Sequence, residues 1–82
     1  MMDFALPSLA AGQREAVITR WLKQPGEVVQ TGDALVEVET EKVNSELESP
    51  FDGVLSEVLA EAGESVAVGR VIARLSPLPT PD

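Results

Sequence analysis

The sequence contains no cysteine, no histidine and no tyrosine. The lack of cysteine excludes disulfide bridges, thiolate nucleophiles and thiolate metal sites. The lack of histidine leaves no side chain whose ordinary pKa lies close to neutrality, so the serine and threonine hydroxyls have no usual general base. These absences argue against self-contained catalysis and predict a non-catalytic domain on which other proteins act.

Basic residues and long apolar runs are also scarce. The chain has 6 lysines and arginines against 14 acidic residues, which gives a formal net charge of −8. Such an excess of negative charge argues against binding to nucleic acids or to anionic membrane surfaces. No apolar run approaches the roughly 20 residues of a membrane-spanning helix. The first residues lack a basic segment and are interrupted by Pro7, so they are not typical of a secretory signal.

What the sequence does contain is the pattern of turns and short strands that is typical of a small all-β domain. Its 82 residues suffice for one domain with a thin core, because a chain of this size buries only about 60% of its surface. Turn-forming residues recur at short intervals, and β-branched runs lie between them. We expect strands at residues 16–19, 35–40, 43–48, 54–58 and 71–75. Residues 55–62 also fit helical spacing, so the local pattern leaves a helix open there.

An internal repeat favours strands over that helix. Shifting the sequence by 37 residues aligns residues 18–38 with residues 55–75. The alignment pairs two glycines of each unit: Gly26 with Gly63, and Gly32 with Gly69. Glycine recurs at such positions where a turn needs positive φ, and the Pro25-Gly26 turn predicts a turn at Gly63 as well. We therefore expect two similar β units related by a quasi-twofold axis around one core, with almost no helix.

The last residues carry proline at every second position from Pro77 to Pro81. Proline cannot donate to a strand ladder and favours an extended chain. Two interpretations remain open, a frayed terminus or the start of an interdomain linker. We place the domain at residues 1–76 and the start of a proline-rich linker at residues 77–82.

A predicted hairpin joins the two β units. Residues 35–40, from Val36 on, and residues 43–48 alternate between apolar and polar residues, and only Glu41 and Lys42 separate the two segments. That length is typical of a tight two-residue hairpin loop, which leaves Lys42 at the tip in solvent. The expected cross-strand pairs are Val36 with Leu47, Glu37 with Glu46, Val38 with Ser45 and Glu39 with Asn44.

The charges of this hairpin are unusual. Residues 33–52 contain seven acidic residues and one basic residue, Lys42, and the whole chain has only one other lysine, Lys23. The acidic residues are Asp33, Glu37, Glu39, Glu41, Glu46, Glu48 and Asp52. Lys42 could be an ordinary surface lysine in a turn. However, like charges opposite one another destabilise a strand pair, so the pair of Glu37 and Glu46 favours recognition over stability as its reason. The alternative is that these glutamates only keep an exposed hairpin soluble and protect its edges.

Lys42 also lies in a recognisable motif, Val38-Glu39-Thr40-Glu41-Lys42-Val43, with Gly32 ten residues before it and Gly53 eleven residues after it. This arrangement resembles the lipoyl domains of the acyltransferase component of 2-oxo acid dehydrogenase complexes, whose motif typically reads Glu-Thr-Asp-Lys-Ala or Glu-Thr-Asp-Lys-Val. The resemblance extends from residue 3 to about residue 76. Further matching segments are Gly32-Asp33-Ala34-Leu35, Ser49-Pro50, Gly53-Val54-Leu55, Phe4-Ala5-Leu6-Pro7-Ser8-Leu9 and Trp21-Leu22-Lys23-Gln24-Pro25-Gly26.

The resemblance implies a fold and a set of site residues. The fold would be a barrel-sandwich hybrid, a flattened β-barrel of two four-stranded antiparallel sheets with the lysine at a hairpin tip. A lipoate ligase or transferase would attach lipoic acid to Lys42 as an amide. Residues implied in recognition of the tip are Glu39, Thr40, Glu41 and Val43; the implied turn glycines are Gly32 and Gly53; the implied partner-recognition loop is Ala11, Gly12, Gln13 and Arg14.

Two departures from the family pattern affect these implications differently. Glu41 stands where aspartate is commoner, which keeps the charge. Arg14-Glu15-Ala16 stands where relatives often have Met-x-Glu-Gly, which changes the first surface loop. The second departure bears on the identity of the partner and not on attachment.

The family's partners would be a thiamine-diphosphate-dependent 2-oxo acid decarboxylase, dihydrolipoamide dehydrogenase and the acyltransferase core. We expect a monomeric carrier domain in the bacterial cytoplasm or, in a eukaryote, in the mitochondrial matrix. We also hypothesise that Glu37, Glu46 and Glu48 steer the domain toward basic surfaces of those partners. The alternatives are a biotinyl carrier domain, whose tip would resemble Ala-Met-Lys-Met, and an unmodified hammerhead interaction module.

Overall fold

The computed structural model describes residues 2–9 and 11–78. Within these ranges the chain forms eight β-strands and no helix. The strands are β1 (Met2–Ala5), β2 (Glu15–Trp21), β3 (Val28–Val29), β4 (Ala34–Glu39), β5 (Asn44–Glu48), β6 (Gly53–Val58), β7 (Ser65–Ala67) and β8 (Val71–Pro77). Accordingly, the described part of the chain offers no helix that could cross a membrane.

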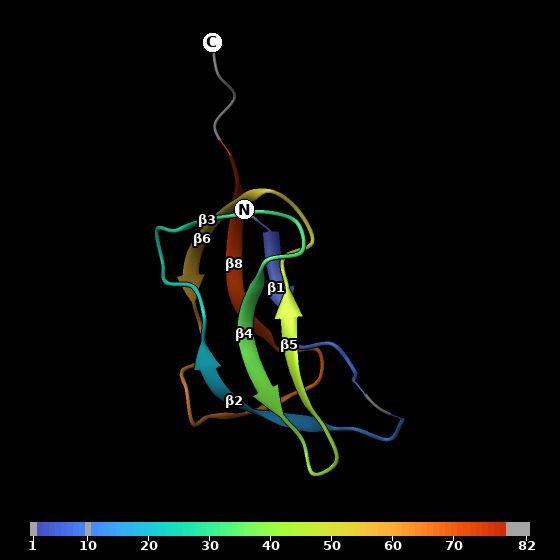
Figure 1. The fold of residues 1–82 in the computed structure, drawn as a ribbon. Coiled ribbons are helices and arrows are strands. Elements are labelled where there is room, and N and C mark those ends of the chain that lie inside the picture. The colour runs from blue at the N-terminus through green and yellow to red at the C-terminus, as the bar shows by residue number, and fades with distance from the viewer. Residues whose placement is uncertain (1, 10, 79–82) are drawn as a thin grey trace.

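The strands form two four-stranded antiparallel sheets, in the orders β1-β8-β6-β3 and β5-β4-β2-β7. Figure 1 shows them curving around a common interior. Read in these orders, each strand of one sheet has a counterpart in the other, so the predicted quasi-twofold arrangement of β units is confirmed. Each sheet combines strands of both units, because β3 joins the sheet of β6, and β7 joins the sheet of β2.

Backbone hydrogen bonds repeat with the same 37-residue shift that relates the sequences. The Gly26 N–H donates to the Leu55 carbonyl at 2.8 Å, and the Gly63 N–H donates to the Ile18 carbonyl at 2.7 Å. All four glycines of the repeat have positive φ, between 90° and 97°. Residues 55–62 therefore contain the end of β6 and a turn, and the helical interpretation of that segment is wrong.

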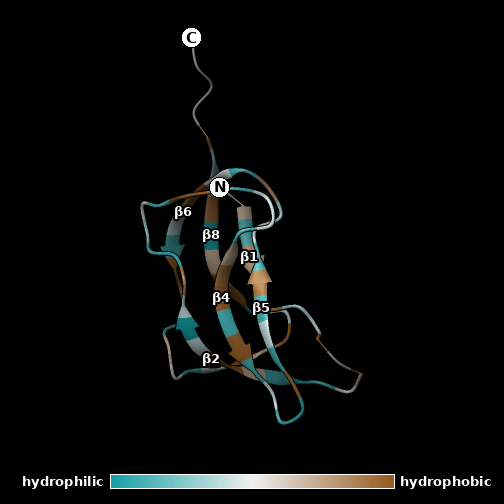
Figure 2. Ribbon diagram, in the orientation of Figure 1, coloured by the Kyte–Doolittle hydropathy of each residue, from teal (hydrophilic) through white to brown (hydrophobic). Residues whose placement is uncertain are grey.

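The core lies between the two sheets and draws on both units. Its fully buried large side chains come from every strand except β1 and β5: Ile18 and Val29, Leu35, Val36 and Val38, Leu55, Val66, and Ile72 and Leu75, together with Leu6 from the loop after β1. Figure 2 shows the alternation of hydrophobic and hydrophilic residues along β4 and β5. Burial of these apolar side chains is the main force that holds the two sheets together.

Three strands were not expected from the sequence. β3 and β7 have only two and three residues, and β1 has no alternating pattern of buried and exposed residues. β8 continues to Pro77, one residue past the predicted end of the domain at residue 76. Residues 79–82 of the predicted linker lie outside the described residues, so that prediction stays open.

Gly53 has a different role from the turn former expected of it. It is buried at the start of β6, and its φ is not in the left-handed region. A Cβ at this position would overlap the Ser76 carbonyl oxygen of the neighbouring strand. Glycine is therefore required here by the close approach of two strands, whereas Gly32 has a φ of 90° and is a true turn glycine.

Candidate functional site

The β4–β5 hairpin projects at the end of the molecule opposite the start of β1 and the end of β8 (Figure 1). The four predicted cross-strand pairs are all present, from Val36 with Leu47 to Glu39 with Asn44. β4 ends at Glu39, one residue before its expected end, and β5 begins at Asn44, one residue after its expected start. Four residues (40–43) therefore connect the two strands instead of two. Glu41 and Lys42 still occupy the middle of this connection.

The tip is closed by the side chain of Thr40. The Thr40 N–H donates to the Val43 carbonyl at 2.8 Å, which forms the innermost backbone pair. The Thr40 hydroxyl oxygen lies 3.1 Å from the Val43 nitrogen and 3.3 Å from the Lys42 nitrogen, and accepts from both. The hydroxyl itself lies 3.3 Å from the Val43 carbonyl oxygen and donates to it.

The two lysines of the chain have different surroundings. Lys42 is exposed, and no ion pair between described residues includes it. The Lys23 amine lies 3.9 Å from the Glu27 carboxylate, and its side chain is only 28% exposed. Of the two amines, that of Lys42 is therefore the one fully available to another protein.

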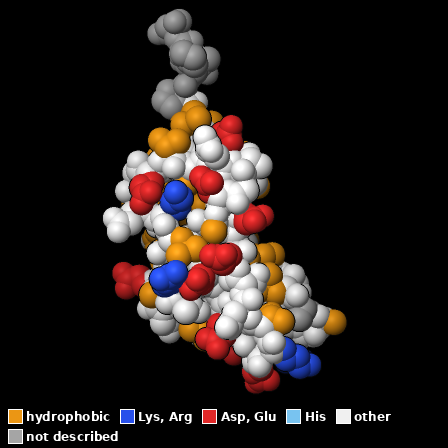
Figure 3. All heavy atoms as spheres, in the orientation of Figure 1, with side chains coloured by type: hydrophobic (Ala, Val, Ile, Leu, Met, Phe, Trp, Pro, Cys, Tyr) orange, Lys and Arg blue, Asp and Glu red, His pale blue; other side chains and the backbone are white. Residues whose placement is uncertain are grey.

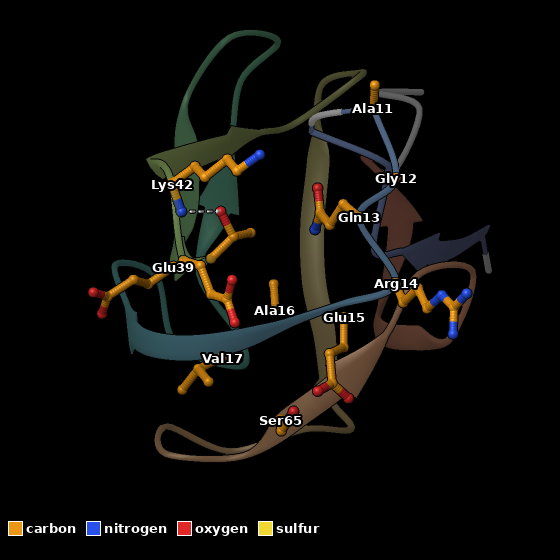
Figure 4. Close-up of a pocket in the computed structure, with 12 residues that line it drawn as sticks. Ala11, Gly12, Gln13, Arg14, Glu15, Ala16, Val17, Glu39, Lys42 and Ser65 are labelled. Carbon is orange, nitrogen blue, oxygen red and sulfur yellow. Dashed lines mark hydrogen bonds between the residues drawn. The ribbon is translucent and has the colours of Figure 1, made fainter.

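The long loop between β1 and β2 lies across from the hairpin and forms the other wall of an open groove of about 510 Å³. Figure 4 shows Lys42 on one side of this groove and Gln13 on the other. The residues that line it are Ala11, Gly12, Gln13, Arg14, Glu15, Ala16, Val17, Glu39, Thr40, Glu41, Lys42 and Ser65. The structure thus brings the predicted recognition loop and the predicted attachment lysine together on one surface.

Local contacts give this loop its shape. The Gln13 side-chain oxygen accepts a hydrogen bond from the Leu9 N–H at 2.6 Å. The Val68 N–H donates to the Arg14 carbonyl at 2.9 Å, and Gly12 has a φ of 77°. Sequence reasoning missed the floor of the groove, which includes Val17 of β2. This apolar residue is 40% exposed. No local signal reveals it, because the floor is formed only when β2 lies beneath both walls.

The seven acidic residues of the segment 33–52 do not form one cluster. Asp33 and Asp52 are at the far end of the hairpin and support turns: Asp33 accepts from the Gln30 N–H at 2.9 Å. Asp52 accepts from the Thr31 N–H at 2.8 Å and from the Thr31 hydroxyl at 3.1 Å. These two hydrogen bonds, first that of the N–H and then that of the hydroxyl, hold the pKa of Asp52 below its ordinary value of 3.8.

The like-charged pair of Glu37 and Glu46 is offset by a residue on the next strand. Arg20 of β2 is opposite Glu37, and its guanidinium lies 3.1 Å from the Glu37 carboxylate. Arg20 therefore relieves part of the expected local repulsion within the sheet, and the steering role of Glu37 stays a prediction. Glu39 and Glu41 remain exposed beside Lys42, and no ion pair between described residues includes them.

Figure 3 shows acidic side chains spread over this face, with few basic ones between them. No group of three or more potential metal ligands occurs among residues 2–9 and 11–78. The site therefore consists of one exposed amine at a tip closed by the Thr40 hydroxyl, with acidic neighbours and an open groove beside it. Such a site can present an attached group to other proteins.

Comparison with known proteins agrees with this geometry. The family model Biotin_lipoyl, described as "Biotin-requiring enzyme", matches residues 2–75. The chain is 46% identical over 76 residues to the dihydrolipoyllysine-residue succinyltransferase component of the 2-oxoglutarate dehydrogenase complex of Bacillus subtilis. It is 42% identical over 73 residues to the dihydrolipoyllysine-residue acetyltransferase component of the pyruvate dehydrogenase complex of Corynebacterium glutamicum.

These relatives are much longer proteins. The matches cover 93% and 89% of this chain but only 18% and 11% of the two relatives. Among solved structures, the lipoyl domain of the 2-oxoglutarate dehydrogenase complex of Azotobacter vinelandii is similar over its full length. That match has a TM-score of 0.79 at 28% identity and covers 96% of this chain.

Proposed function

Since the chain belongs to the biotin/lipoyl family and is a lipoyl domain homologous to the acyltransferase components of 2-oxo acid dehydrogenase complexes, we propose that Lys42 is its site of lipoylation. The observation that carries this proposal is the exposed amine of Lys42 at the hairpin tip, which forms no ion pair with another described residue. An accessible primary amine is the group that an amide bond to lipoic acid requires, so the residues present fit the cofactor.

The protein's own part in the reaction is presentation. The lipoyl group supplies a disulfide that can accept an acyl group and pass it on. The hairpin holds the attachment point at one end of a rigid domain, so that the reach comes from the side chain and the local concentration at each partner is high. Amide formation removes the charge of Lys42, which would change the formal net charge from −8 to −9.

Partner contacts would be made on the surface around the tip. We propose that the loop residues Ala11–Arg14 and the exposed Glu39 and Glu41 contact a thiamine-diphosphate-dependent 2-oxo acid decarboxylase across the groove. The acyltransferase core and dihydrolipoamide dehydrogenase would then act on the same lipoyl group, carried on the Lys42 side chain. Because the chain spans less than a fifth of these relatives, we further propose that it is part of a longer bacterial dihydrolipoamide acyltransferase in the cytoplasm.

Intact-mass measurement tests the attachment site. The chain is co-expressed with a lipoate ligase as wild type, Lys42→Ala and Lys23→Ala. We expect one lipoyl increment on the wild type and on Lys23→Ala, and none on Lys42→Ala. No increment on the wild type, or an increment that persists in Lys42→Ala, would refute the proposal.

The same experiment with a biotin ligase distinguishes the other cofactor of the family. Thr40-Glu41-Lys42-Val43 lacks the methionines expected on both sides of a biotinylated lysine. We therefore expect no biotin increment on any of the three proteins. A biotin increment on the wild type would assign the domain to a carboxylase instead.

A further inference from the structure

The connection at Lys42 closes without glycine or asparagine. Residues 40–43 form it, and connections of four residues are most often built around a type I turn, which needs no positive φ. Its central residues are Glu41 and Lys42, and no non-glycine residue in the described part of the chain has positive φ. Among the hydrogen bonds between described residues, no backbone carbonyl accepts from the Lys42 or Val43 N–H. The tip therefore needs another acceptor to close it.

The Thr40 hydroxyl supplies that closure. A threonine hydroxyl has one donor and two acceptor positions. All three are used inside the tip, since it accepts from the Lys42 and Val43 N–H groups and donates to the Val43 carbonyl. Because of this bonding, the Thr40 side chain faces the turn, and it is less exposed than Glu41, Lys42 and Val43.

These bonds are also what restrains Lys42. Its side chain has no ion pair with another described residue, so its position depends on its backbone. The backbone N–H of Lys42 is held by Thr40 alone among the hydrogen bonds between described residues. We propose that Thr40 is a positioning residue; this proposal rests on the proposed lipoylation of Lys42. Thr40 holds the tip in the shape that the modifying enzyme binds and makes no contact with that enzyme.

This assignment divides the residues around Lys42 by role. Glu39, Glu41 and Val43 are exposed and can touch another protein, and Val43 is 38% exposed. Thr40 acts through the conformation of Lys42. Without the hydroxyl, the tip has to be ordered when the enzyme binds it, and that ordering weakens binding rather than slowing the chemical step.

Steady-state lipoylation of the purified apo chain tests the proposal. Thr40→Val keeps the shape of the side chain and removes the hydroxyl, whereas Thr40→Ser keeps the hydroxyl. We expect Thr40→Val to raise KM for the domain roughly tenfold, with kcat within about twofold of wild type, and Thr40→Ser to restore KM. Thr31→Val, which also loses an exposed hydrogen-bonded hydroxyl but at the far end, should match the wild type.

Amide hydrogen exchange provides a readout that does not depend on lipoylation. The Lys42 and Val43 amides should lose protection in Thr40→Val and keep it in Thr40→Ser, while the amides of β2 and β6 keep theirs in both. If Thr40→Val matches the wild type in KM and in exchange, the proposal is wrong. It is equally wrong if Thr40→Ser is as impaired as Thr40→Val, because the methyl group would then be the recognised feature. A wild-type chain that is not lipoylated at all would refute the proposed function, and the exchange data would still test the role of Thr40.

Discussion

The two β units share their core and turns and differ in what lies at their ends. In the first unit, β4 continues through residues 40–43 into β5, while the counterpart of β4, β8, runs toward the end of the chain. The loop from β1 to β2 has nine residues, but the corresponding loop from β5 to β6 has four. Both departures from the repeat occur at the end of the molecule that carries Lys42 (Figure 1).

The repeated parts of the molecule provide its stability, whereas the hairpin and the long loop form its candidate site. The equivalent turns and buried positions of the two units form the core, and neither unit could bury its apolar face alone. The hairpin and the long loop add little to that core, yet together they form the groove beside Lys42. We infer that the repeat provides a rigid body and that the departures from it provide the site.

The sharpest test of the repeat is at Gly53 and its counterpart Ala16, which is buried in β2. Gly53→Ala should lower the free energy of unfolding by about 3 kcal/mol, because the new Cβ overlaps the Ser76 carbonyl. Ala16→Gly should cost about 1.5 kcal/mol, through one lost buried methyl group and a more flexible backbone.

Urea denaturation followed by the fluorescence of the single tryptophan measures both. Trp21 is suited to this use because it is partly buried and its indole N–H donates to the Ala60 carbonyl at 2.8 Å. A Gly53→Ala variant that is as stable as the wild type would mean that the two units tolerate a Cβ equally at this position. The close approach of β6 to β8 would then not constrain the sequence.

The acidic residues of the two ends should differ in their effect on partner enzymes. Glu39→Gln with Glu41→Gln should lower the rate of reductive acylation by a decarboxylase about threefold at low salt and weaken its salt dependence. A control with Glu27→Gln and Glu61→Gln removes the same charge from exposed positions in the turns before β3 and β7, outside the groove, and should change the rate by less than about 1.5-fold. Equal effects of the two double variants would indicate a response to net charge alone.

The smallest expected effect concerns Asp52, whose hydrogen bonds to Thr31 have no equivalent in the repeat, where Glu15 and Val68 stand instead. Because folding lowers the pKa of Asp52, its contribution to stability is fully present above the ordinary value of 3.8 and is lost as the pH falls through the folded-state pKa. The urea midpoints of wild type and Asp52→Asn should therefore differ at about pH 5 and converge toward about pH 2. A difference that stays constant over this range would exclude the carboxylate as its source.

Much of the fold could be predicted because its signals are local or repeated. The alternation on both sides of Glu41 and Lys42 gave the correct cross-strand pairs, since a slip of one residue would expose Val36 and Val38. The helical interpretation of residues 55–62 could be rejected only through the repeat. The short strands β3 and β7 could not be predicted, because two or three residues carry no pattern until a partner strand lies beside them.

The site was predictable to a different extent at each residue. The motif around Lys42 and the spacing of Gly32 and Gly53 are properties of the chain itself, as are the net charge and the absence of catalytic side chains. The sequence by itself therefore determined the β units, the hairpin register and the position of the exposed lysine. These depend on short-range alternation and turn chemistry.

Tertiary structure alone decided the rest. It placed Arg20 beside Glu37, brought Ser76 close enough to Gly53 to exclude a Cβ, and set the loop Ala11–Arg14 across a groove from Lys42. Each of these contacts joins residues on different strands or loops. The physical reason is that distances across a sheet or between loops follow from which strands become neighbours, and no local pattern fixes that choice.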